Sequence, residues 1–283
     1  MQTVTTVAEL RQQISTWKSQ GKKIVLVPTM GNLHAGHLTL MQHAYHCGDK
    51  VVCSVFVNAL QFDRSEDLKS YPRTPEQDLA ALQDEKVDLV FMPEHDEVYA
   101  EEHRPQNDIP KHSFNQQLCG EHRPGFFDGI VEVVARLFHI IRPDVAVFGE
   151  KDYQQLIIIK RLVQDMGLPI EIEHVPTQRE EDGLAYSSRN SYLNTEERAK
   201  ARHIYATLLA VKTQIESGSN DYVAIEKQAM DRLSQAGFRP DYVAIRDAID
   251  LGQASYDTEF IVVLVSAWLG EARLIDNILL QMR

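Results

Sequence analysis

Short apolar runs alternate with amphipathic stretches along the first 176 residues of the chain. Four runs rich in valine, isoleucine or phenylalanine are too short for buried helices and predict strands at Lys23–Pro28, Val51–Val57, Asp88–Met92 and Val145–Phe148. Stretches with helical spacing predict helices at His37–Cys47, Pro75–Lys86, Phe127–Ile141 and Tyr153–Met166. Strands and helices that alternate in this way favour a parallel sheet with right-handed crossovers and helices on both faces. The expected fold class is therefore α/β, with a doubly wound sheet.

The alternation stops after about residue 176. Asn194 is an expected N-cap, because Glu197 follows three residues later, and a long helix is expected from there to about Ser217. The other elements expected in this part are one helix and two strands, at Asp221–Gln235, Tyr242–Arg246 and Phe260–Val265. We therefore expect two domains, at residues 1–176 and 177–283, of which the second is a smaller α+β domain.

Composition narrows the class of protein. The chain has 283 residues, of which 43% are apolar and 25% charged, as in globular proteins with a sizeable core. No apolar run approaches the ~20 residues of a membrane span, so no membrane association is expected. The net charge of −12 argues against nucleic-acid binding through phosphates. Three cysteines without CxxC spacing predict no disulfide framework, and favour a reducing cytoplasm.

The segment Pro28–His37, PTMGNLHAGH, directly follows the first predicted strand. In doubly wound sheets, ligands bind where strands lead into helices. Gly31 and Gly36 let backbone approach a ligand closely, and the N-terminus of the next helix attracts anions. His34 and His37 lie about one turn apart, so both rings can donate hydrogen bonds to one phosphate group. The alternative is a pair of surface histidines at a helix cap; a zinc pair is disfavoured, because no further ligand stands at a supporting spacing.

Two polar clusters lie at comparable places. Gly149–Asp152, GEKD, follows the predicted strand Val145–Phe148, so that Lys151 can neutralise phosphate charge and Asp152 can accept from ribose hydroxyls. Tyr186–Arg189, YSSR, offers two hydroxyls and a guanidinium that can hold a leaving pyrophosphate. Each has a plain structural alternative: a solvated turn for the first cluster and a serine-rich turn for the second.

A third cluster carries uncharged amides. Asn58 and Gln61 lie among apolar residues in FVNALQF, Phe56–Phe62, and Gln155 follows GEKD by less than one helical turn. Buried amides suit a small molecule that carries hydroxyls and a carboxylate, because an unpaired partner would be costly. Alternatively, Asn58 is a turn residue and Gln155 an exposed helix residue.

Together these segments resemble one family, the ATP-dependent pantoate–β-alanine ligases. Five segments are similar to the family's motifs in order and spacing: PTMGNLHAGH, FVNALQF, YPRTPEQDL (Tyr71–Leu79), GEKDYQQL (Gly149–Leu156) and DGLAYSSRNSYL (Asp182–Leu193). The resemblance continues into the tail AWLGEARLIDN, Ala267–Asn277. It implies a Rossmann-like nucleotidyltransferase fold related to class I tRNA synthetases, in which HxGH resembles the HIGH signature and SSR takes the place of the mobile KMSKS-type loop. It also implies a cytoplasmic homodimer.

The resemblance implies a role for each matching residue. Those expected to bind ATP are Met30, Gly31, Asn32, Leu33, His34, Ala35, Gly36, His37, Gly149, Glu150, Lys151, Asp152, Gln178, Tyr186, Ser187, Ser188 and Arg189. Those expected to be catalytic are His37, His34, Lys151 and Arg189, of which His37 is the residue usually given a proton-donor role. The backbone near Gln178 is expected at the adenine. Gln61 and Gln155 are expected to bind pantoate, with Asn58 beside them and Gln61 also meeting β-alanine.

The chain departs from the family pattern at four of these positions. Ala59 and Leu60 replace the proline and methionine of FVNPMQF, which loses a turn-fixing proline but keeps both amides. Tyr186 replaces a frequent leucine before SSR, and Gln178 stands where an apolar residue is usual. Since the backbone makes the contact at 178, only local packing is affected there.

The implied reaction joins pantoate to β-alanine through pantoyl adenylate, with Mg²⁺ accompanying ATP. Lys151, Arg189 and the histidines would neutralise the departing pyrophosphate, and the smaller domain would close as a lid over the hydrolysable intermediate. The sequence does not identify the residues that bind Mg²⁺, and Asp78 is only a weak candidate. Two other functions remain: a cytidylyltransferase, which would need a second phosphate pocket, and a non-catalytic nucleotide-binding module.

Overall fold

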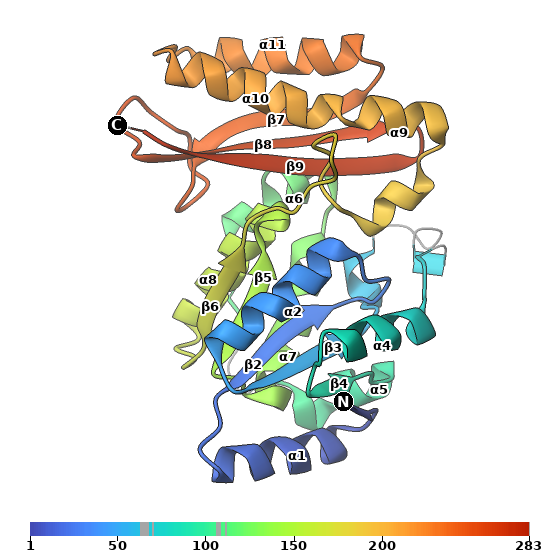
Figure 1. The fold of residues 1–283 in the computed structure, drawn as a ribbon. Helices are drawn as coiled ribbons and strands as arrows, with labels where there is room; N and C mark the ends of the chain where they lie inside the picture. Colours follow the sequence, from blue (N-terminus) through green and yellow to red (C-terminus); the bar gives the residue numbers. More distant parts are fainter. Residues whose placement is uncertain (63–67, 70, 106–108, 111, 283) are drawn as a thin grey trace. The chain divides into compact units, whose positions relative to one another are not determined.

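The computed structural model describes residues 1–62, 68–69, 71–105, 109–110 and 112–282 (Figure 1). The chain forms two compact units. The first comprises Met1–Glu150 and Ile158–Pro176, and the second comprises Lys151–Ile157 and Thr177–Arg283.

A parallel sheet forms the centre of the first unit. Its strand order is β1-β4-β3-β2-β5-β6, and every described pairing is parallel. The strands are β1 (Gln2–Val4), β2 (Ile24–Thr29), β3 (Lys50–Val55), β4 (Leu89–Phe91), β5 (Val145–Gly149) and β6 (Glu171–Val175). The order runs outward in both directions from β2, so the carboxyl ends of β2, β3 and β5 lie next to one another at the site of a topological switch.

Helices cover both faces of this sheet. Val25 and Val27 of β2 pack against Met41 and Ala44 of α2, whereas Ile24 and Leu26 point to the opposite face. The helices whose residues lie wholly or partly in this unit are α1 (Val7–Ser19), α2 (Ala35–Cys47), α4 (Pro75–Asp84), α5 (His95–Tyr99), α6 (Cys119–His122), α7 (Phe126–Ile141) and α8 (Tyr153–Asp165). Their starts carry ordinary helix signals, such as the Thr6–Glu9 capping box of α1 and Pro75 in the first turn of α4.

Single-turn 3₁₀ helices complete the connections. They are η1 (Ala59–Gln61), η2 (Glu101–His103), η3 (Ser113–Gln116), η4 (Glu150–Asp152) and, in the second unit, η5 (Ser188–Tyr192). Two of them lie at the carboxyl ends of strands, where ligands bind in this class of fold: η1 begins shortly after the end of β3, and η4 directly follows β5.

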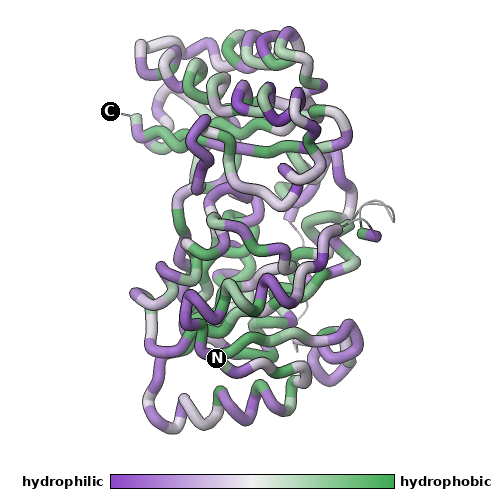
Figure 2. The backbone as a smooth tube through the Cα atoms, turned by 45° about the vertical axis from the view of Figure 1, so that its right-hand side comes forward, coloured by the Kyte–Doolittle hydropathy of each residue, from purple (hydrophilic) through white to green (hydrophobic). Residues whose placement is uncertain are grey.

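The second unit is a three-stranded antiparallel sheet with helices on one face. Its strands, in the order β7-β8-β9, are β7 (Arg239–Asp247), β8 (Phe260–Leu269) and β9 (Ala272–Gln281). Its helices are α9 (Thr195–Ala201), α10 (His203–Glu216) and α11 (Tyr222–Gln235). Leu208 and Val211 of α10 and Leu233 of α11 pack on Val263 and Val265 of β8. Figure 2 shows the apolar segments concentrated in the strands, with polar and apolar positions alternating along the helices.

The fold class expected from the sequence is confirmed, with element ends shifted by a few residues. One expectation was wrong: the long helix after Asn194 is two helices, α9 and α10, which meet at Arg202. The apolar spacing continues through the break, from Ala201 to Ile204 and Leu208, which are all buried. The apolar pattern therefore gave no sign of it. The Asn194–Glu197 capping box is confirmed.

Three strands were not expected. β1 is short, and β6, at the edge of the sheet, has three polar residues among its five, Glu171, Glu173 and His174. β9 was missed because Asp276 and Asn277 interrupt its apolar pattern, although Gly270 makes the tight turn that joins it to β8.

Candidate active site

The loop Met30–His34 leaves β2 in an unusual backbone conformation. Gly31 and Asn32 have φ angles of 77° and 49°, a region that favours glycine and tolerates asparagine. Asp78, in the first turn of α4, accepts hydrogen bonds from Asn32 N at 2.9 Å and Leu33 N at 2.8 Å. A Cβ atom at Gly31 would lie 3.0 Å from Asp78 Oδ2. The loop is therefore held by a buried carboxylate from a distant segment.

This arrangement bears on the weak expectation that Asp78 binds Mg²⁺. Its side chain is 3% exposed, and Oδ1 also accepts from the hydroxyl of Thr74 at 3.2 Å. Both carboxylate oxygens are thus occupied by protein donors. The structure assigns Asp78 to positioning the loop, and argues against its acting as a metal ligand.

His34 and His37 lie side by side at the start of α2. Their ring centroids are 4.0 Å apart and their planes differ by 23°. The backbone N–H of His34 donates to Nδ1 of His37 at 3.4 Å. Nδ1 is therefore unprotonated in the neutral ring, so that Nε2 carries the hydrogen and can donate to an anion. Both side chains are half-buried, next to backbone amides of the helix N-terminus.

Asn58 and Gln61 are brought together by the turn η1. Asn58 is 1% exposed, and its Nδ2 donates to Gln61 Oε1 and to Gly129 O, both at 3.0 Å. Its Oδ1 accepts from Tyr99 Oη at 2.8 Å, and burial raises the pKa of this phenol, which keeps it a donor. Both hydrogens of the Asn58 side-chain amide are thus used within the protein. It orients Gln61, whose Nε2 has no hydrogen-bond partner among the described residues.

Helix α7 approaches this turn unusually closely. A Cβ atom at Gly129 would lie 2.3 Å from Leu60 O and 3.0 Å from Gln61 N. Only glycine fits there, because the contact is with backbone that cannot rotate away. Arg123 adds a hydrogen bond from Nη2 to Gln61 O at 3.1 Å. The backbone of Gln61 is therefore fixed from two sides.

The end of β5 supplies Gly149 and Glu150. A Cβ atom at Gly149 would lie 3.9 Å from Leu40 of α2, so the strand end and the helix that carries the histidines are in contact. Glu150 is expected in the ATP set, but its Oε1 lies 2.7 Å from Nδ1 of His174 on β6. Its carboxylate therefore already has a partner on the neighbouring strand of the same sheet.

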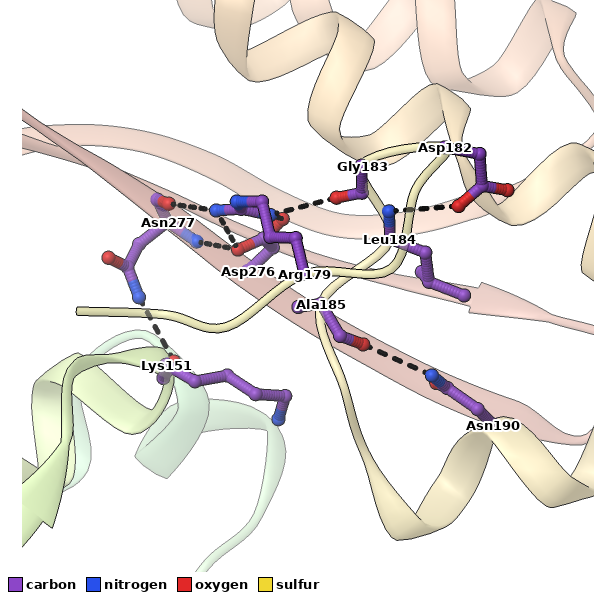
Figure 3. A network of polar contacts seen from close by, with 9 residues as sticks. All are labelled: Lys151, Arg179, Asp182, Gly183, Leu184, Ala185, Asn190, Asp276 and Asn277. Atoms are coloured by element: carbon purple, nitrogen blue, oxygen red, sulfur yellow. Dashed lines mark hydrogen bonds and ion pairs between the residues drawn. The ribbon is translucent and has the colours of Figure 1, made fainter. Parts of the chain in front are cut away.

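Lys151 and Asp152 belong to the second unit. Lys151 Nζ lies 3.9 Å from Asp152 Oδ2, and the Lys151 side chain is 19% exposed whereas that of Asp152 is 50% exposed. Asn277 of β9 donates from Nδ2 to Lys151 O at 3.0 Å (Figure 3). Gln155 follows on α8 and is half-buried. The ammonium is thus carried on a backbone that β9 holds in place.

A short hairpin brings Gln178 opposite Tyr186. Tyr186 N donates to Gln178 O at 3.0 Å, and Arg179 pairs with Ala185 as an antiparallel bridge. The guanidinium of Arg179 makes two hydrogen bonds to Asp276, from Nη1 to Oδ2 at 2.6 Å and from Nη2 to Oδ1 at 2.9 Å (Figure 3). Burial pushes the pKa of Asp276 above its ordinary value of 3.8, while Arg179 acts in the opposite direction. The hairpin is thereby fastened to β9.

The serine-rich segment continues from this hairpin. Ser187 caps η5, because its side chain accepts a hydrogen bond from Arg189 N at 3.2 Å. The alternative prediction of a serine-rich turn therefore also fits this segment. Asn190 donates to Ala185 O at 3.1 Å (Figure 3). Ser187, Ser188 and Arg189 are half-buried.

Each unit thus gathers part of the expected set. The first brings the histidine loop, Gly149 and the Asn58–Gln61 pair to one sheet edge, and the second connects Lys151 and the 178–186 hairpin through β9. Sequence reasoning named Asp78 only as a weak metal candidate, and it missed the other residues that hold these groups, Tyr99, Gly129, Arg179, Asp276 and Asn277. The polar pair Asp276–Asn277 in an apolar tail was the one signal that could have found two of them.

Comparison with known proteins decides the family. The sequence profile of the pantoate–β-alanine ligase family matches residues 2–279. The chain belongs to the pantoate–β-alanine ligase family. The protein is therefore a ligase, and the family resemblance inferred from its motifs is confirmed.

Relatives in this ligase family match nearly the whole chain. It is 49% identical over 277 residues to the pantothenate synthetase of Aeromonas hydrophila, covering 98% of this chain and 97% of that one. The crystal structure of pantothenate synthetase from Thermus thermophilus matches with a TM-score of 0.90 and 43% identity, over 98% of this chain and 99% of that chain. That of the Francisella tularensis pantoate–β-alanine ligase, complexed with β-γ ATP and β-alanine, matches with a TM-score of 0.80 and 31% identity, over 99% and 97%. Within the described residues, no helix of the ligase is long and apolar enough to cross a membrane.

Proposed function

We propose that the protein condenses pantoate with β-alanine at the expense of ATP, in two steps through pantoyl adenylate. The observation that carries this proposal is the histidine loop at the carboxyl end of β2, held by Asp78 in a chain that belongs to this ligase family. A complex of β-γ ATP and β-alanine with a relative of 31% identity supports ATP and β-alanine as substrates.

In the first step, a pantoate carboxylate oxygen attacks the α-phosphorus of ATP, and the bond to pyrophosphate breaks. The carboxylate is a weak nucleophile, so alignment and neutralisation of the leaving group supply most of the acceleration. His37 donates from Nε2 to the phosphates, with His34 stacked beside it. Lys151 and Arg189 bring positive charge to the pyrophosphate, together with the hydroxyls of Ser187 and Ser188.

In the second step, the amine of β-alanine attacks the pantoyl carbonyl, an amide forms and AMP leaves. Gln61 is oriented by Asn58 so that its Nε2 hydrogens can reach an acid group of the substrate. Gln155 serves pantoate in the same way. Asn58 acts through Gln61, because its own amide is fully used by Gln61, Gly129 and Tyr99.

The residues expected to surround the rest of ATP keep their proposed roles. Gly149 and Asp152 bind the ribose, and the backbone at Gln178 contacts the adenine. The remaining members of the ATP set are Met30, Gly31, Asn32, Leu33, Ala35, Gly36, Glu150 and Tyr186. Of these, Glu150 has its carboxylate already engaged by Nδ1 of His174.

Mg²⁺ is expected to accompany ATP, and the carboxylates of Asp78 and Glu150 are both engaged by other groups of the protein. Asp78 uses both oxygens for backbone amides, and Glu150 is paired with His174. Mg²⁺ keeps several waters and commonly binds through substrate phosphates. We therefore propose that the ion enters as part of the ATP complex, held by phosphates and water.

The second unit is proposed to act as a lid during the reaction. Pantoyl adenylate is a mixed anhydride open to hydrolysis, and a closing domain would exclude water. Proteolysis between Asp182 and Asn190 should therefore slow when ATP and pantoate are both present. A cleavage rate that does not change at saturation would contradict closure.

We further propose that the protein is cytoplasmic and forms a homodimer. Sedimentation at micromolar concentration would test the homodimer.

The deciding experiment is exchange of labelled pyrophosphate into ATP, measured with pantoate and without β-alanine. The ligase predicts pantoate-dependent exchange, whereas a cytidylyltransferase or a non-catalytic module predicts none. His37→Gln should slow the exchange by roughly ten- to a thousandfold, as for loss of one electrostatic donor. Exchange at the parental rate in a folded His37→Gln variant would contradict the role of His37.

A further inference from the structure

A second cluster of side chains lies away from the proposed substrate groups, on the same first unit. His43 and Cys47 are four residues apart on one face of α2, and Glu173 projects from the adjacent edge strand β6. The ligand atoms of all three lie within 4.8 Å of one another. His43 Nε2 is 3.5 Å from Glu173 Oε2. Among the described residues, this is the one group of three such side chains within that distance.

The histidine of this cluster has an unusual environment. Its Nε2 atom is buried and makes no hydrogen bond, although the side chain as a whole is 35% exposed. A buried polar atom without a hydrogen bond is costly, and in native proteins it calls for an explanation such as an ion. The atom faces a carboxylate and lies near a thiol, which are both ligands for metals that bind imidazole.

The thiol is the accessible one of the chain's three. Cys47 is half-buried, whereas Cys53 and Cys119 are buried. Its Sγ donates to His43 O at 3.4 Å, so the thiol lies against the same turn of α2 as the histidine.

We propose that His43, Cys47 and Glu173 bind one zinc ion. The set of one imidazole nitrogen, one thiolate sulfur and one carboxylate oxygen suits Zn²⁺, which takes these ligands in tetrahedral geometry and leaves a fourth position for water. Zn²⁺ displaces the Cys47 thiol proton to solvent, so binding releases one proton. The thiolate and carboxylate together neutralise the two positive charges of the ion.

The proposed ion would fasten α2 to the edge strand β6. His43 lies roughly 9 Å along the helix from His37, at a rise of about 1.5 Å per residue, so the zinc site is separate from the phosphate-binding histidines. We therefore expect the ion to stabilise the first unit against unfolding, while the reaction proceeds without it.

The test measures binding of Zn²⁺ alone to chelator-treated protein, by competition with a chromophoric zinc indicator. One equivalent should bind, and Cys47→Ser and His43→Gln should each weaken it by at least about 100-fold, which is the upper range for loss of a supporting group. Glu173→Gln should also weaken it. His46→Gln is the matched control, because His46 is exposed on the same helix and outside the cluster.

Cobalt substitution gives a second readout that does not depend on activity. Co²⁺ should produce a sulfur-to-cobalt charge-transfer band that is present in the parent and in His46→Gln and absent in Cys47→Ser. Zn²⁺ should also slow alkylation of Cys47. Zinc affinity that is unchanged in Cys47→Ser, or lost in a His34→Gln/His37→Gln variant and kept in the cluster variants, would overturn the proposal.

Discussion

Asn277, near the end of the chain, holds the backbone of Lys151 with a hydrogen bond of 3.0 Å from Nδ2 to the carbonyl oxygen (Figure 3). The neighbouring Asp276 receives both nitrogens of the Arg179 fork, and Asn277 O accepts from Arg179 Nη2 at 3.2 Å. One dipeptide of β9 thus positions both the proposed phosphate-binding lysine and the hairpin that leads to the serine-rich segment.

This connection predicts that Asn277 acts through Lys151. Lys151→Ala should slow pantoyl adenylate formation by roughly ten- to a thousandfold. Asn277→Ala should slow it by about tenfold, the rate equivalent of one hydrogen bond. In the double variant the Asn277 change should add almost nothing, because its effect passes through the lysine. Single-turnover measurement of adenylate checks this, and fully multiplicative losses would show that Asn277 does not act through Lys151.

The buried ion pair predicts a stability effect with a characteristic recovery. Asp276 is 2% and Arg179 17% exposed in their side chains. Arg179→Met should lower the free energy of unfolding by about 3–5 kcal/mol, because it leaves a buried carboxylate without its partner. Adding Asp276→Leu should restore much of the loss, since an apolar pair has no such charge. Urea unfolding measures both variants, and equal instability in the single and double variants would contradict this account.

The close approach of α7 predicts a specific defect in pantoate binding. Gly129→Ala puts a methyl group where Leu60 O lies 2.3 Å away, which forces η1 and Gln61 to move. Pantoate should bind roughly ten- to a hundredfold more weakly, and the same is expected of Gln61→Leu, which removes the amide itself, while ATP affinity without pantoate stays nearly unchanged in both. Calorimetry measures both affinities. Leu60→Ala is the control, because that side chain is 52% exposed and its backbone is kept.

The structural role of Asp78 separates it from a metal ligand. Asp78→Asn replaces one acceptor oxygen by an NH₂ group that faces a backbone N–H, so the loop Gly31–Leu33 should shift and ATP should bind more weakly. A loss of about 1.5–3 kcal/mol in unfolding free energy is expected for a charge-assisted hydrogen bond. The Mg²⁺ concentration that gives half-maximal exchange, at saturating ATP, should not change. A large increase in it would reinstate Asp78 as a ligand.

Asp182 predicts part of the acid sensitivity of the second unit. Its hydrogen bonds from Arg198, at 2.6 and 3.2 Å, hold the pKa of the carboxyl below its ordinary value of 3.8. Because this pKa is lower in the folded state, the stabilisation is complete above the ordinary value and is lost as pH falls through the folded one. Asp182→Asn should therefore lower the free energy of unfolding at pH 7. The difference between this variant and the parent should disappear in acid. Glu181→Gln, at an exposed neighbour, is the control, and a constant difference at all pH values would contradict this.

The sequence by itself determined the elements whose apolar pattern is local, and through its motifs the family. The strands β2, β3, β4 and β5 are short valine-rich or phenylalanine-containing runs, and the helices between them carry apolar faces, so their burial could be predicted without knowing the partners. The motifs likewise placed His34, His37, Lys151 and Arg189 beyond strands or at turns, where ligands bind in this class of fold.

Tertiary structure alone decided which polar groups hold these residues in place. Asp78 reaches the amides of Asn32 and Leu33 from a separate helix, and Gly129 is needed only because α7 touches the backbone of η1. The physical reason is that apolar periodicity reports which face of an element is buried, whereas a buried carboxylate or amide is stable only beside partners from distant parts of the chain. In the sequence, Asp276 and Asn277 interrupt the apolar pattern of a strand. In the structure, they form hydrogen bonds with Arg179 and with the backbone of Lys151.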